Sequence, residues 1–442
     1  MINEQKINKV LKTIKQKRIR DIQLWFTDIL GYLKCVTITD SEIHEALTHG
    51  KGFDGSSITG FAEAEESDII ARADPDSFTV LPWEGTEAPV GRMFCDIMNP
   101  DGTPYPGDPR YALKKQVDRA KKMGLDFYVG PELEFFYFKT DSKPEIVDDG
   151  KYFDLIPNDL ANSLRKKTTR MLESVGIQIE ASHHEVAPSQ HEIDLKYDKA
   201  AIMADKVMTY KMVVKEIAQQ SGVHATFMPK PLFGVCGSGM HVHQSLFRGK
   251  KNAFFDKRDK YGLSKVAKYF IAGQLKHAFE MSSVFGQWVN SYKRLVPGYE
   301  APIYISWARR NRTALIRVPY YKPGHENATR AELRCPDPSC NPYLAFAVML
   351  AAGLEGIEKK YEITEPIEPN IYKMEVEEKE RRGLKSLPVD LFEAIKATEK
   401  SKIVREALGE HIFPRFIHSK MKEWEDFRIR ITSYEIEKYL NL

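Results

Sequence analysis

The segment NPDGTPYPGDPR (residues 99–110) restricts the fold of this chain more than any other feature of its sequence. Its four prolines and two glycines exclude both the interior of a helix and a central strand. It divides the chain of 442 residues into a small first part and a larger second part. We therefore predict two domains, one over residues 1–104 and one over residues 105–442.

Helical and strand-like patterns are mixed on both sides of this segment. In the first part, a helix over residues 3–18 precedes short apolar strands, which favours a small mixed sheet. In the second part, a strand over residues 127–139 lies among helices such as 198–221, 263–285 and 342–360. Because strands and helices do not follow a strict β–α–β order, we predict an α+β fold.

The composition argues against several classes of function. Lys and Arg number 65 against 62 Asp and Glu, so the charge gives no reason to expect a nucleic acid or a membrane as partner. The apolar run over residues 344–353 is too short to span a bilayer. Five cysteines without a C-x-x-C spacing favour a reducing compartment, and we expect a cytoplasmic protein.

The segment GPELEFF (residues 130–136) places charge where a strand normally carries apolar side chains. Residues two apart on a strand point to one face, about 6.5–7 Å apart, so Glu132 and Glu134 are neighbours. Two like charges there are unfavourable unless a cation or a proton lies between them. Taken alone, this segment is explained slightly better by a solvated sheet face.

The segment HHEVAPSQHEID (residues 183–194) combines histidines and acids around a turn. Two extended arms flank Pro188 and Ser189, where the chain reverses. Glu185 and Glu192 could therefore converge across the turn.

Two shorter segments repeat the pattern of polar residues on one strand face. In GSGMHVH, His241 and His243 share a face, and the glycines permit close approach of the backbone to a ligand. In RAELR, the side chains of Arg330, Glu332 and Arg334 all point the same way. A satisfied core histidine and a salt-bridged surface ladder are the ordinary explanations of each segment alone.

Together, these segments provide a set of hard metal ligands. The set consists of five glutamates and one histidine: Glu132, Glu134, Glu185, Glu192, Glu332 and His241. Such ligands suit Mg²⁺ or Mn²⁺, and two ions could share them while leaving positions open for substrate oxygens.

An arginine cluster follows in the same region. It contains Arg294, Arg309, Arg310, Arg312, Arg317, Arg330 and Arg334. Guanidinium groups bind carboxylates and phosphates, so metal ligands with arginines indicate a phosphoryl-transfer site. The sequence contains no G-x-x-x-x-G-K-[ST] loop, so a nucleotide would bind through metals and arginines.

Seven motifs in order along the chain resemble type I glutamine synthetase. They are GFDGSSITGF (52–61), GPELEFF (130–136), HHEVAPSQHEID (183–194), GSGMHVH (237–243), RLVPGYEAP (294–302), RNRTALIRVP (310–319) and RAELRCPDPSCNPYLAF (330–346). The chain lacks an extra segment of roughly 25 residues, and in this respect it resembles the alpha-like subgroup. The resemblance implies a β-grasp-like N-terminal domain and a catalytic domain built on a curved antiparallel sheet flanked by helices.

The resemblance implies an enzyme that joins ammonia to the γ-carboxyl group of L-glutamate with ATP as substrate, giving L-glutamine, ADP and phosphate. In the first step ATP phosphorylates glutamate, and in the second ammonia displaces the phosphate from γ-glutamyl phosphate. Two Mg²⁺ ions per active site, or Mn²⁺, are the implied cofactors. The implied assembly is a dodecamer of two stacked hexamers, which could also bind a nitrogen-regulatory protein.

The resemblance also implies a role for each site residue. Glu134, Glu185 and Glu192 would hold the first metal, and Glu132, His241 and Glu332 the second. Gly237, Arg294, Glu300, Arg312 and Arg334 would bind glutamate. His243, Ser245, Arg312, Arg317 and Arg330 would bind the nucleotide, with Arg312 also acting on the transferring phosphoryl group.

Two further acids correspond to catalytic residues of the family. Asp54 would attract ammonium and help to remove its proton. Without the resemblance, the Asp54–Gly55 pair reads more simply as a hairpin turn. Glu300 lies in a Gly- and Pro-bounded loop that would close over the intermediate. In the family, the acid corresponding to Asp54 comes from a neighbouring subunit.

Two positions depart from the family pattern within the motifs. Cys236 replaces a usual Asn that helps to hold glutamate, and a thiol is a weak hydrogen-bonding partner. Ser189 replaces a usual Gly. A turn tolerates a serine at this position if the backbone φ angle there is negative. Its hydroxyl could also form a new ligand contact.

Other positions bear on regulation. Glu63 stands where many alpha-type members carry an Arg linked to feedback inhibition, so we expect weak inhibition by glutamine. Tyr372 corresponds to a tyrosine that beta-type members adenylylate, but the flanking residues differ and we do not expect modification. Arg18 and Arg20 could bind an anionic effector such as 2-oxoglutarate, although a solvated face or a ring contact is the favoured explanation.

Two alternatives remain open from the sequence. One is a ligase of the same fold that joins glutamate to a polyamine or an alkylamine instead of ammonia. The other is a non-catalytic relative, which would not need the complete set of metal ligands.

Overall fold

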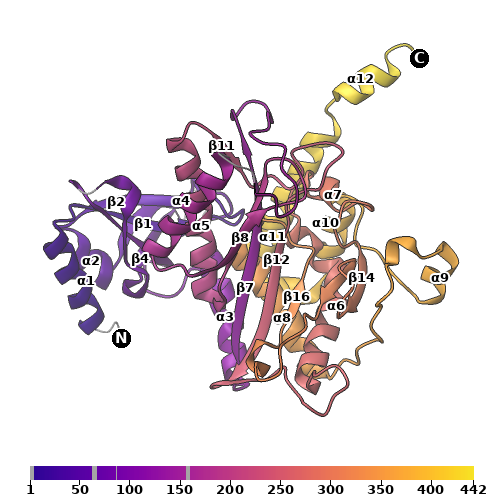
Figure 1. The fold of residues 1–442 in the computed structure, drawn as a ribbon. Helices are drawn as coiled ribbons and strands as arrows, with labels where there is room; N and C mark the ends of the chain where they lie inside the picture. The colour runs from indigo at the N-terminus through magenta and orange to yellow at the C-terminus, as the bar shows by residue number, and fades with distance from the viewer. Residues whose placement is uncertain (1–3, 62–66, 86, 156–159) are drawn as a thin grey trace.

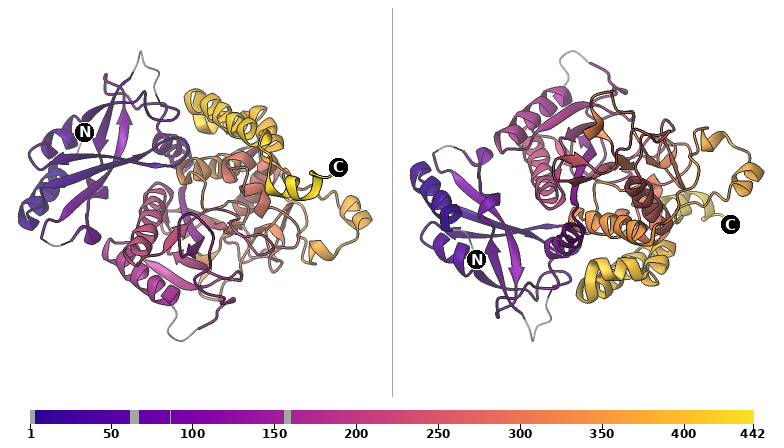
Figure 2. Two further views of the ribbon diagram at one scale, coloured as in Figure 1. Left: turned by 90° about the horizontal axis from the view of Figure 1, so that it is seen from above. Right: turned by 90° about the horizontal axis from the view of Figure 1, so that it is seen from below.

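The structure is a computed structural model that describes residues 4–61, 67–85, 87–155 and 160–442. A small N-terminal sheet with its helices lies beside a large sheet surrounded by helices (Figure 1 and Figure 2). The small domain is indigo in Figure 1, and the yellow C-terminal helix projects from the opposite side. This arrangement confirms the predicted α+β class.

The small sheet is mixed, as predicted. Its strands are β1 (Asp21–Thr27), β2 (Leu33–Thr39), β3 (Lys51–Asp54), β4 (Asp68–Ala73), β5 (Thr79–Leu81) and β6 (Val90–Met98). The strand order is β2–β1–β6–β4–β3 with β5 beside β6, and β1 and β6 are parallel. Helices α1 (Glu4–Lys17) and α2 (Ile43–Thr48) pack on this sheet, and the apolar face of α1 is buried through Ile7, Val10 and Ile14.

The large sheet carries most of the motif residues. Its strands are β7 (Asp126–Phe138), β8 (Ile179–His184), β9 (Gln190–Leu195), β10 (Asp198–Lys199), β11 (His224–Thr226), β12 (Met240–Arg248), β13 (Lys251–Asn252), β14 (Tyr304–Ala308), β15 (Ala314–Arg317) and β16 (Ala331–Leu333). The main order is β14–β15–β16–β12–β7–β9–β8. Its strand pairs are antiparallel except for β14 and β15, so segments far apart in sequence become neighbours at β7 and β12.

Helices surround the large sheet. They are α3 (Pro109–Lys122), α4 (Leu160–Ser174), α5 (Ala200–Gln220), α6 (Lys265–Phe285), α7 (Ser291–Arg294), α8 (Pro342–Lys359), α9 (Val376–Arg381), α10 (Leu391–Glu399), α11 (Lys402–Arg428) and α12 (Ser433–Tyr439). Helices α6 and α8 approach closely because Gly273 has no side chain; a Cβ atom there would lie 2.1 Å from the Ala352 carbonyl oxygen. Within the described residues, no helix is long and apolar enough to cross a bilayer.

One buried guanidinium group joins the two domains. Arg110, near the start of α3, lies 2.7 Å from Asp74, 2.5 Å from Asp96 and 2.9 Å from Asp205. Asp74 and Asp96 belong to the small sheet region, whereas Asp205 lies on α5 of the large domain. A guanidinium group has five N–H donors, so it can bind three carboxylates at once. This ion cluster therefore holds the proline-rich segment and both domains in one arrangement.

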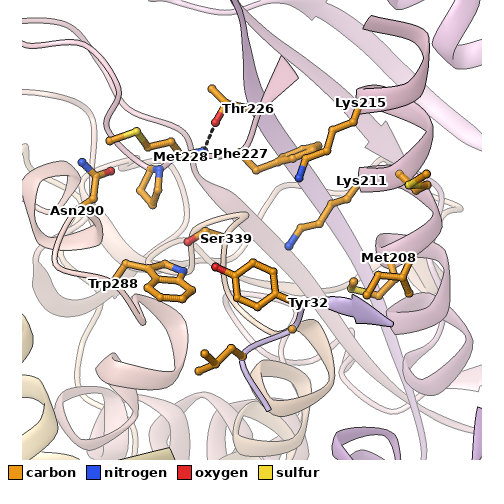
Figure 3. A pocket seen from close by; sticks show the side chains of 15 residues that line it. Tyr32, Met208, Lys211, Lys215, Thr226, Phe227, Met228, Trp288, Asn290 and Ser339 are labelled. Carbon is orange, nitrogen blue, oxygen red and sulfur yellow. Dashed lines mark hydrogen bonds between the residues drawn. The ribbon is translucent and has the colours of Figure 1, made fainter. Parts of the chain in front are cut away.

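A cavity of about 330 Å³ lies where the loop between β1 and β2 meets α5 (Figure 3). The rings of Tyr32 and Trp288 lie beside each other at this cavity, with centroids 6.1 Å apart and planes tilted by 59°. Lys211 extends toward the cavity, and burial lowers the pKa of its ammonium group to about 8. The residues that line this cavity include none of the residues that the sequence predicts for the active site.

We expect Arg110→Met to destabilise the protein by about 3–5 kcal/mol, because it leaves the buried Asp205 and the partly buried Asp74 without their counter-ion, whereas Asp96 keeps Lys114. Arg119→Met is the matched control, since Arg119 forms a partly exposed ion pair with Glu358 that contributes at most about 1 kcal/mol. Denaturant unfolding of both variants provides the measurement. Equal stability of the two variants would contradict the role given to Arg110.

Candidate active site

The alternation of side chains along β7 and β12 separates the main core from a polar face. Leu133 of β7 and Val242 of β12 are completely buried in the core. Glu132 and Glu134 therefore point to the opposite face of β7. His241 of β12 is in register with Glu132 and shares that face. Three of the predicted metal ligands thus come together on two adjacent strands.

The first cluster of ligand atoms forms around Glu132. One carboxylate oxygen of Glu132 lies 3.3 Å from His241 Nδ1, and the other lies 2.6 Å from His243 Nε2. Glu332 comes from β16 and places Oε1 3.9 Å from His241 Nδ1. Glu132, His243 and Glu332 also offer ligand atoms within 4.8 Å of one another. Glu132, His241 and Glu332, which the resemblance assigns to the second metal, are therefore brought together in this first cluster.

The second cluster forms where the hairpin of β8 and β9 reaches β7. Glu185 and Glu192 offer ligand atoms within 4.8 Å of each other and of His183, so the two arms do converge across the turn. Glu134 is in register with Glu192 on the adjacent strand. The Gln190 side chain donates a hydrogen bond of 2.9 Å to Glu134 Oε2. Glu134, Glu185 and Glu192, which the resemblance assigns to the first metal, therefore share this second cluster.

Burial of these carboxylates alters their acidity. Burial and the nearby charge of Glu185 raise the pKa of Glu134 to about 8. Burial and Asp194 raise the pKa of Glu192 well above its usual range, and burial raises the pKa of Asp194 to about 6. The carboxylates are therefore unfavourable as a cluster of bare negative charges, and a bound cation would relieve their repulsion.

The donor set fits a hard divalent cation. Both clusters present carboxylate oxygens, together with imidazole nitrogens, and neither includes a thiol. Carboxylates are the ligands that Mg²⁺ and Mn²⁺ prefer, whereas structural zinc sites are usually rich in cysteine. The two clusters, joined through Glu132, Glu134 and Glu192, are suited to a pair of such ions.

Glu332 also links the metal region to the arginine cluster. Its side chain is completely buried and forms ion pairs with Arg317 and Arg334. Burial acts against ionisation, but the Arg334 charge holds the pKa of Glu332 at about 2. Arg334 and Arg317 thus lie directly beside the candidate ligands, where they could also reach a bound anion.

A second cavity, of about 220 Å³, opens beside Glu132. His243, Ser245 and Arg330, three residues predicted to bind a nucleotide, all line it. Arg330 Nε donates a hydrogen bond of 3.1 Å to His243 Nδ1. The cavity is also lined by Asp194 and Asn327, and by Tyr128 and Tyr197, two aromatic residues that belong to none of the motifs found in the sequence.

The predicted glutamate-binding residues Gly237, Arg294 and Arg334 lie near the second cluster. The Gly237 carbonyl accepts a hydrogen bond from Gln190, and a Cβ atom on Gly237 would lie 2.2 Å from the Pro229 carbonyl oxygen. Arg294 is buried and donates a hydrogen bond to the Cys335 carbonyl at 2.8 Å. Its guanidinium group would also contact a Cβ atom on Gly239, so the glycines make room for it.

Three other predicted residues lie outside these clusters. Arg312 is exposed and hydrogen-bonds with Tyr152. Glu300 is exposed in the loop between α7 and β14, with a positive φ of 58°. Asp54 ends β3 of the small sheet, where its carboxylate accepts a hydrogen bond from the Ser56 amide. Among the described residues, the acidic clusters of the large sheet do not include Asp54.

The departures from the family pattern have different outcomes. The condition under which a turn readily tolerates Ser189, a negative φ, is not met, since its φ is 59°. The hydroxyl of Ser189 compensates by accepting a hydrogen bond from the Val147 amide at 2.7 Å. Cys236 packs beside Leu232 and Val235, and burial raises the pKa of its thiol to about 11, so it is protonated at neutral pH. Glu63 lies outside the described residues.

Comparison with known proteins agrees with this geometry. Residues 18–100 match the β-grasp domain of glutamine synthetase, and residues 106–439 match the glutamine synthetase catalytic domain. The chain belongs to the glutamine synthetase family. Membership of the glutamine synthetase family and the predicted N-terminal β-grasp domain are thereby confirmed.

Curated relatives are similar over nearly their whole length. A glutamine synthetase of Methanosarcina mazei is 50% identical over 98% of this chain and 97% of its own. A glutamine synthetase of Thermotoga maritima is 49% identical over 99% of this chain and 100% of its own.

Solved structures share the fold. A cryo-EM structure of Plasmodium falciparum glutamine synthetase is 26% identical, with a TM-score of 0.87 over 99% of both chains. A structure described as a GmaS/ADP complex is 30% identical, with a TM-score of 0.88 over 100% of both chains.

We expect Mn²⁺ to raise the melting temperature of this glutamine synthetase family member, because a cation stabilises the buried carboxylates only in the folded state. A free Mn²⁺ concentration of about 100 times Kd would raise the free energy of unfolding by about 2.7 kcal/mol. Differential scanning fluorimetry with and without EDTA measures the shift. Glu192→Gln should reduce the shift, whereas Glu365→Gln, at an exposed surface pair, should retain it. A shift of equal size in both variants would contradict the site.

Proposed function

We propose that this chain catalyses the ATP-dependent ligation of ammonia to the γ-carboxyl group of L-glutamate, giving L-glutamine, ADP and phosphate. The observation that carries this proposal is the meeting of two acidic clusters on one sheet face, within a chain of the glutamine synthetase family. The arginines beside Glu332 supply the positive charge that phosphoryl transfer requires.

Glu134, Glu185 and Glu192 would hold one divalent ion, and Glu132, His241 and Glu332 the other, with Mg²⁺ or Mn²⁺ as the metal. When bound, such ions neutralise phosphate charge and orient the reacting oxygens. His243, Ser245, Arg317 and Arg330 would bind the nucleotide in and beside the cavity of about 220 Å³. Gly237, Arg294 and Arg334 would bind glutamate at the neighbouring cluster.

In the first step, the γ-carboxylate of glutamate attacks the terminal phosphorus of ATP, which forms γ-glutamyl phosphate and releases ADP. Arg312 and Arg334 would stabilise the charge on the transferring group. In the second step, ammonia attacks the activated carbonyl carbon and phosphate leaves. Asp54 would take a proton from ammonium, and Glu300 would shield the intermediate from water and accept the proton lost by the adduct.

Asp54 lies on the small sheet, so we propose that it serves the active site of a neighbouring subunit. This requires a closed ring in which the domain of residues 1–104 meets the catalytic domain, residues 105–442, of the next copy. We propose a dodecamer of two stacked hexamers as the assembly, a cytoplasmic location and membership of the alpha-like subgroup. The Tyr372 hydroxyl donates to the Ala301 carbonyl, which supports the expectation that it is not adenylylated.

The alternative is a ligase that uses an alkylamine or polyamine as acceptor. Asp54 favours ammonia as the acceptor, because a bulky amine would need more room beside this carboxylate.

The decisive assay measures phosphate release from ATP by the purified protein with glutamate and ammonium, each alone and together. We expect release only with both substrates, and little with methylamine or putrescine in place of ammonium. Faster turnover with an alkylamine would favour the alternative ligase. Activity in millimolar glutamine should stay near its full value, and a parallel series with 2-oxoglutarate tests for an anionic effector.

We expect Glu332→Ala to lower this activity by about 100-fold or more, because it removes a buried ligand and leaves two arginines unpaired. Size-exclusion chromatography should show the same assembly as the wild type. Glu365→Ala at the exposed pair with Lys260 serves as the control and should retain activity. Wild-type turnover in Glu332→Ala would contradict the assignment of the site.

A further inference from the structure

The turn between β8 and β9 is covered by a segment from another part of the chain. After β7, the chain folds back on itself, and Phe138 pairs with Ile146 in an isolated bridge. The residues that follow reach the turn, where Asp148 meets Ser189. Asp148 belongs to none of the motifs identified in the sequence. Its side chain has only 6% of its surface exposed, and Ser189 is completely buried.

The Ser189 hydroxyl fastens the turn to this segment. Its oxygen accepts hydrogen bonds from the amides of Val147 at 2.7 Å and Asp148 at 3.2 Å, and it donates to the Asp148 carbonyl at 3.2 Å. The backbone of Ser189 has a φ of 59°, a conformation that glycine adopts with the least strain. Ser189 therefore adopts a backbone conformation that serine disfavours, and the three hydrogen bonds of its hydroxyl offset the cost in free energy.

The Asp148 carboxylate joins both arms of the hairpin. Its Oδ1 accepts hydrogen bonds from His184 Nε2 at 2.6 Å and from the Ser189 amide at 3.1 Å. Its Oδ2 lies 3.3 Å from His191 Nε2. His184 lies on β8 and His191 on β9, and the two residues are in register. One carboxylate thus contacts the turn and both strands that lead into it.

These contacts lead directly to the acids of the second cluster. His184 Nδ1 donates a hydrogen bond of 2.7 Å to the carbonyl oxygen of Glu185, the next residue. His191 immediately precedes Glu192, and its Nδ1 accepts a hydrogen bond of 2.8 Å from Arg165. The orientation of both rings therefore fixes the backbone on either side of the turn.

We propose that Asp148 and the Ser189 hydroxyl are positioning residues that hold Glu185 and Glu192 in the geometry for binding a divalent cation. This inference rests on the proposed function, because it takes those two glutamates as metal ligands. Groups that orient metal ligands typically change metal affinity by about 10–100-fold when they are removed. The inference also explains why a serine stands at a turn position that favours glycine.

The first test measures Mn²⁺ binding to the assembled protein by the EPR signal of free Mn²⁺, which does not depend on activity. Asp148→Asn keeps the shape but removes the charge, and we expect one class of sites to weaken by about 10–100-fold. The Mn²⁺ affinity of the sites formed by Glu132, His241 and Glu332 should remain unchanged. The kcat at saturating Mn²⁺ should stay near the wild-type value. Ser182→Ala, on the exposed part of β8, is the control.

The second test uses a matched pair at the turn. Ser189→Ala and Ser189→Gly both remove the hydroxyl, but only glycine relieves the positive φ. We expect both to weaken Mn²⁺ binding by the same factor, about threefold to tenfold. Ser189→Gly should have the higher melting temperature. If the hydroxyl only stabilised the fold, Mn²⁺ affinity would follow the melting temperature, and Ser189→Gly would bind Mn²⁺ more tightly than Ser189→Ala. That result would overturn the inference.

Glu192→Gln separates failure of this inference from failure of the proposed function. If Glu192→Gln removes one class of Mn²⁺ sites but Asp148→Asn binds like the wild type, the positioning role is wrong and the metal site stands. If the wild-type protein binds no Mn²⁺, both the proposed function and this inference fail.

Discussion

Carboxylates that share one buried face of a sheet repel each other, and the architecture of this site depends on how that repulsion is balanced. Glu134 and Glu192 are held at positions where burial opposes their charge, as their raised pKa values indicate. Glu332 is equally buried but is balanced by two arginines. The site thus contains one part that is already neutralised and one part that requires a cation, which is the combination that metal-assisted phosphoryl transfer uses.

The large sheet makes this balance possible. Strands β7 and β12 place their apolar residues in the main core, so the acids on the other face cannot turn away without breaking that core. Strand β16 then brings Glu332, about ninety residues after His241 in the sequence, to the same face. The stability of the fold and the proximity of like charges are therefore maintained by the same hydrogen-bonded ladder.

The sequence predicted the local part of this arrangement well. The period of two along strands was enough to group Glu132 with Glu134 and His241 with His243. The order of the strands depends on pairings between distant segments, which spacing cannot reveal, so the convergence with Glu332 needed the family resemblance. The positive φ of Ser189 could not be predicted from the sequence, because a tertiary contact with Asp148, some forty residues earlier, stabilises a conformation that local preference disfavours. The small sheet also separates Asp54 from the clusters within one chain, which no local pattern could show.

The Arg110 ion cluster has a geometric consequence beyond stability. In any ring built from identical copies, the turn from one copy to the next must divide the full circle evenly. If the small domain of one copy meets the large domain of the next, that turn is set by the angle between the two domains. Asp74, Asp96 and Asp205 help to fix this angle through Arg110, together with apolar side chains of the small domain, such as Trp25 and Phe94, that pack into the main core. The geometry of such a ring would then depend on contacts inside each subunit as well as on the surfaces between copies.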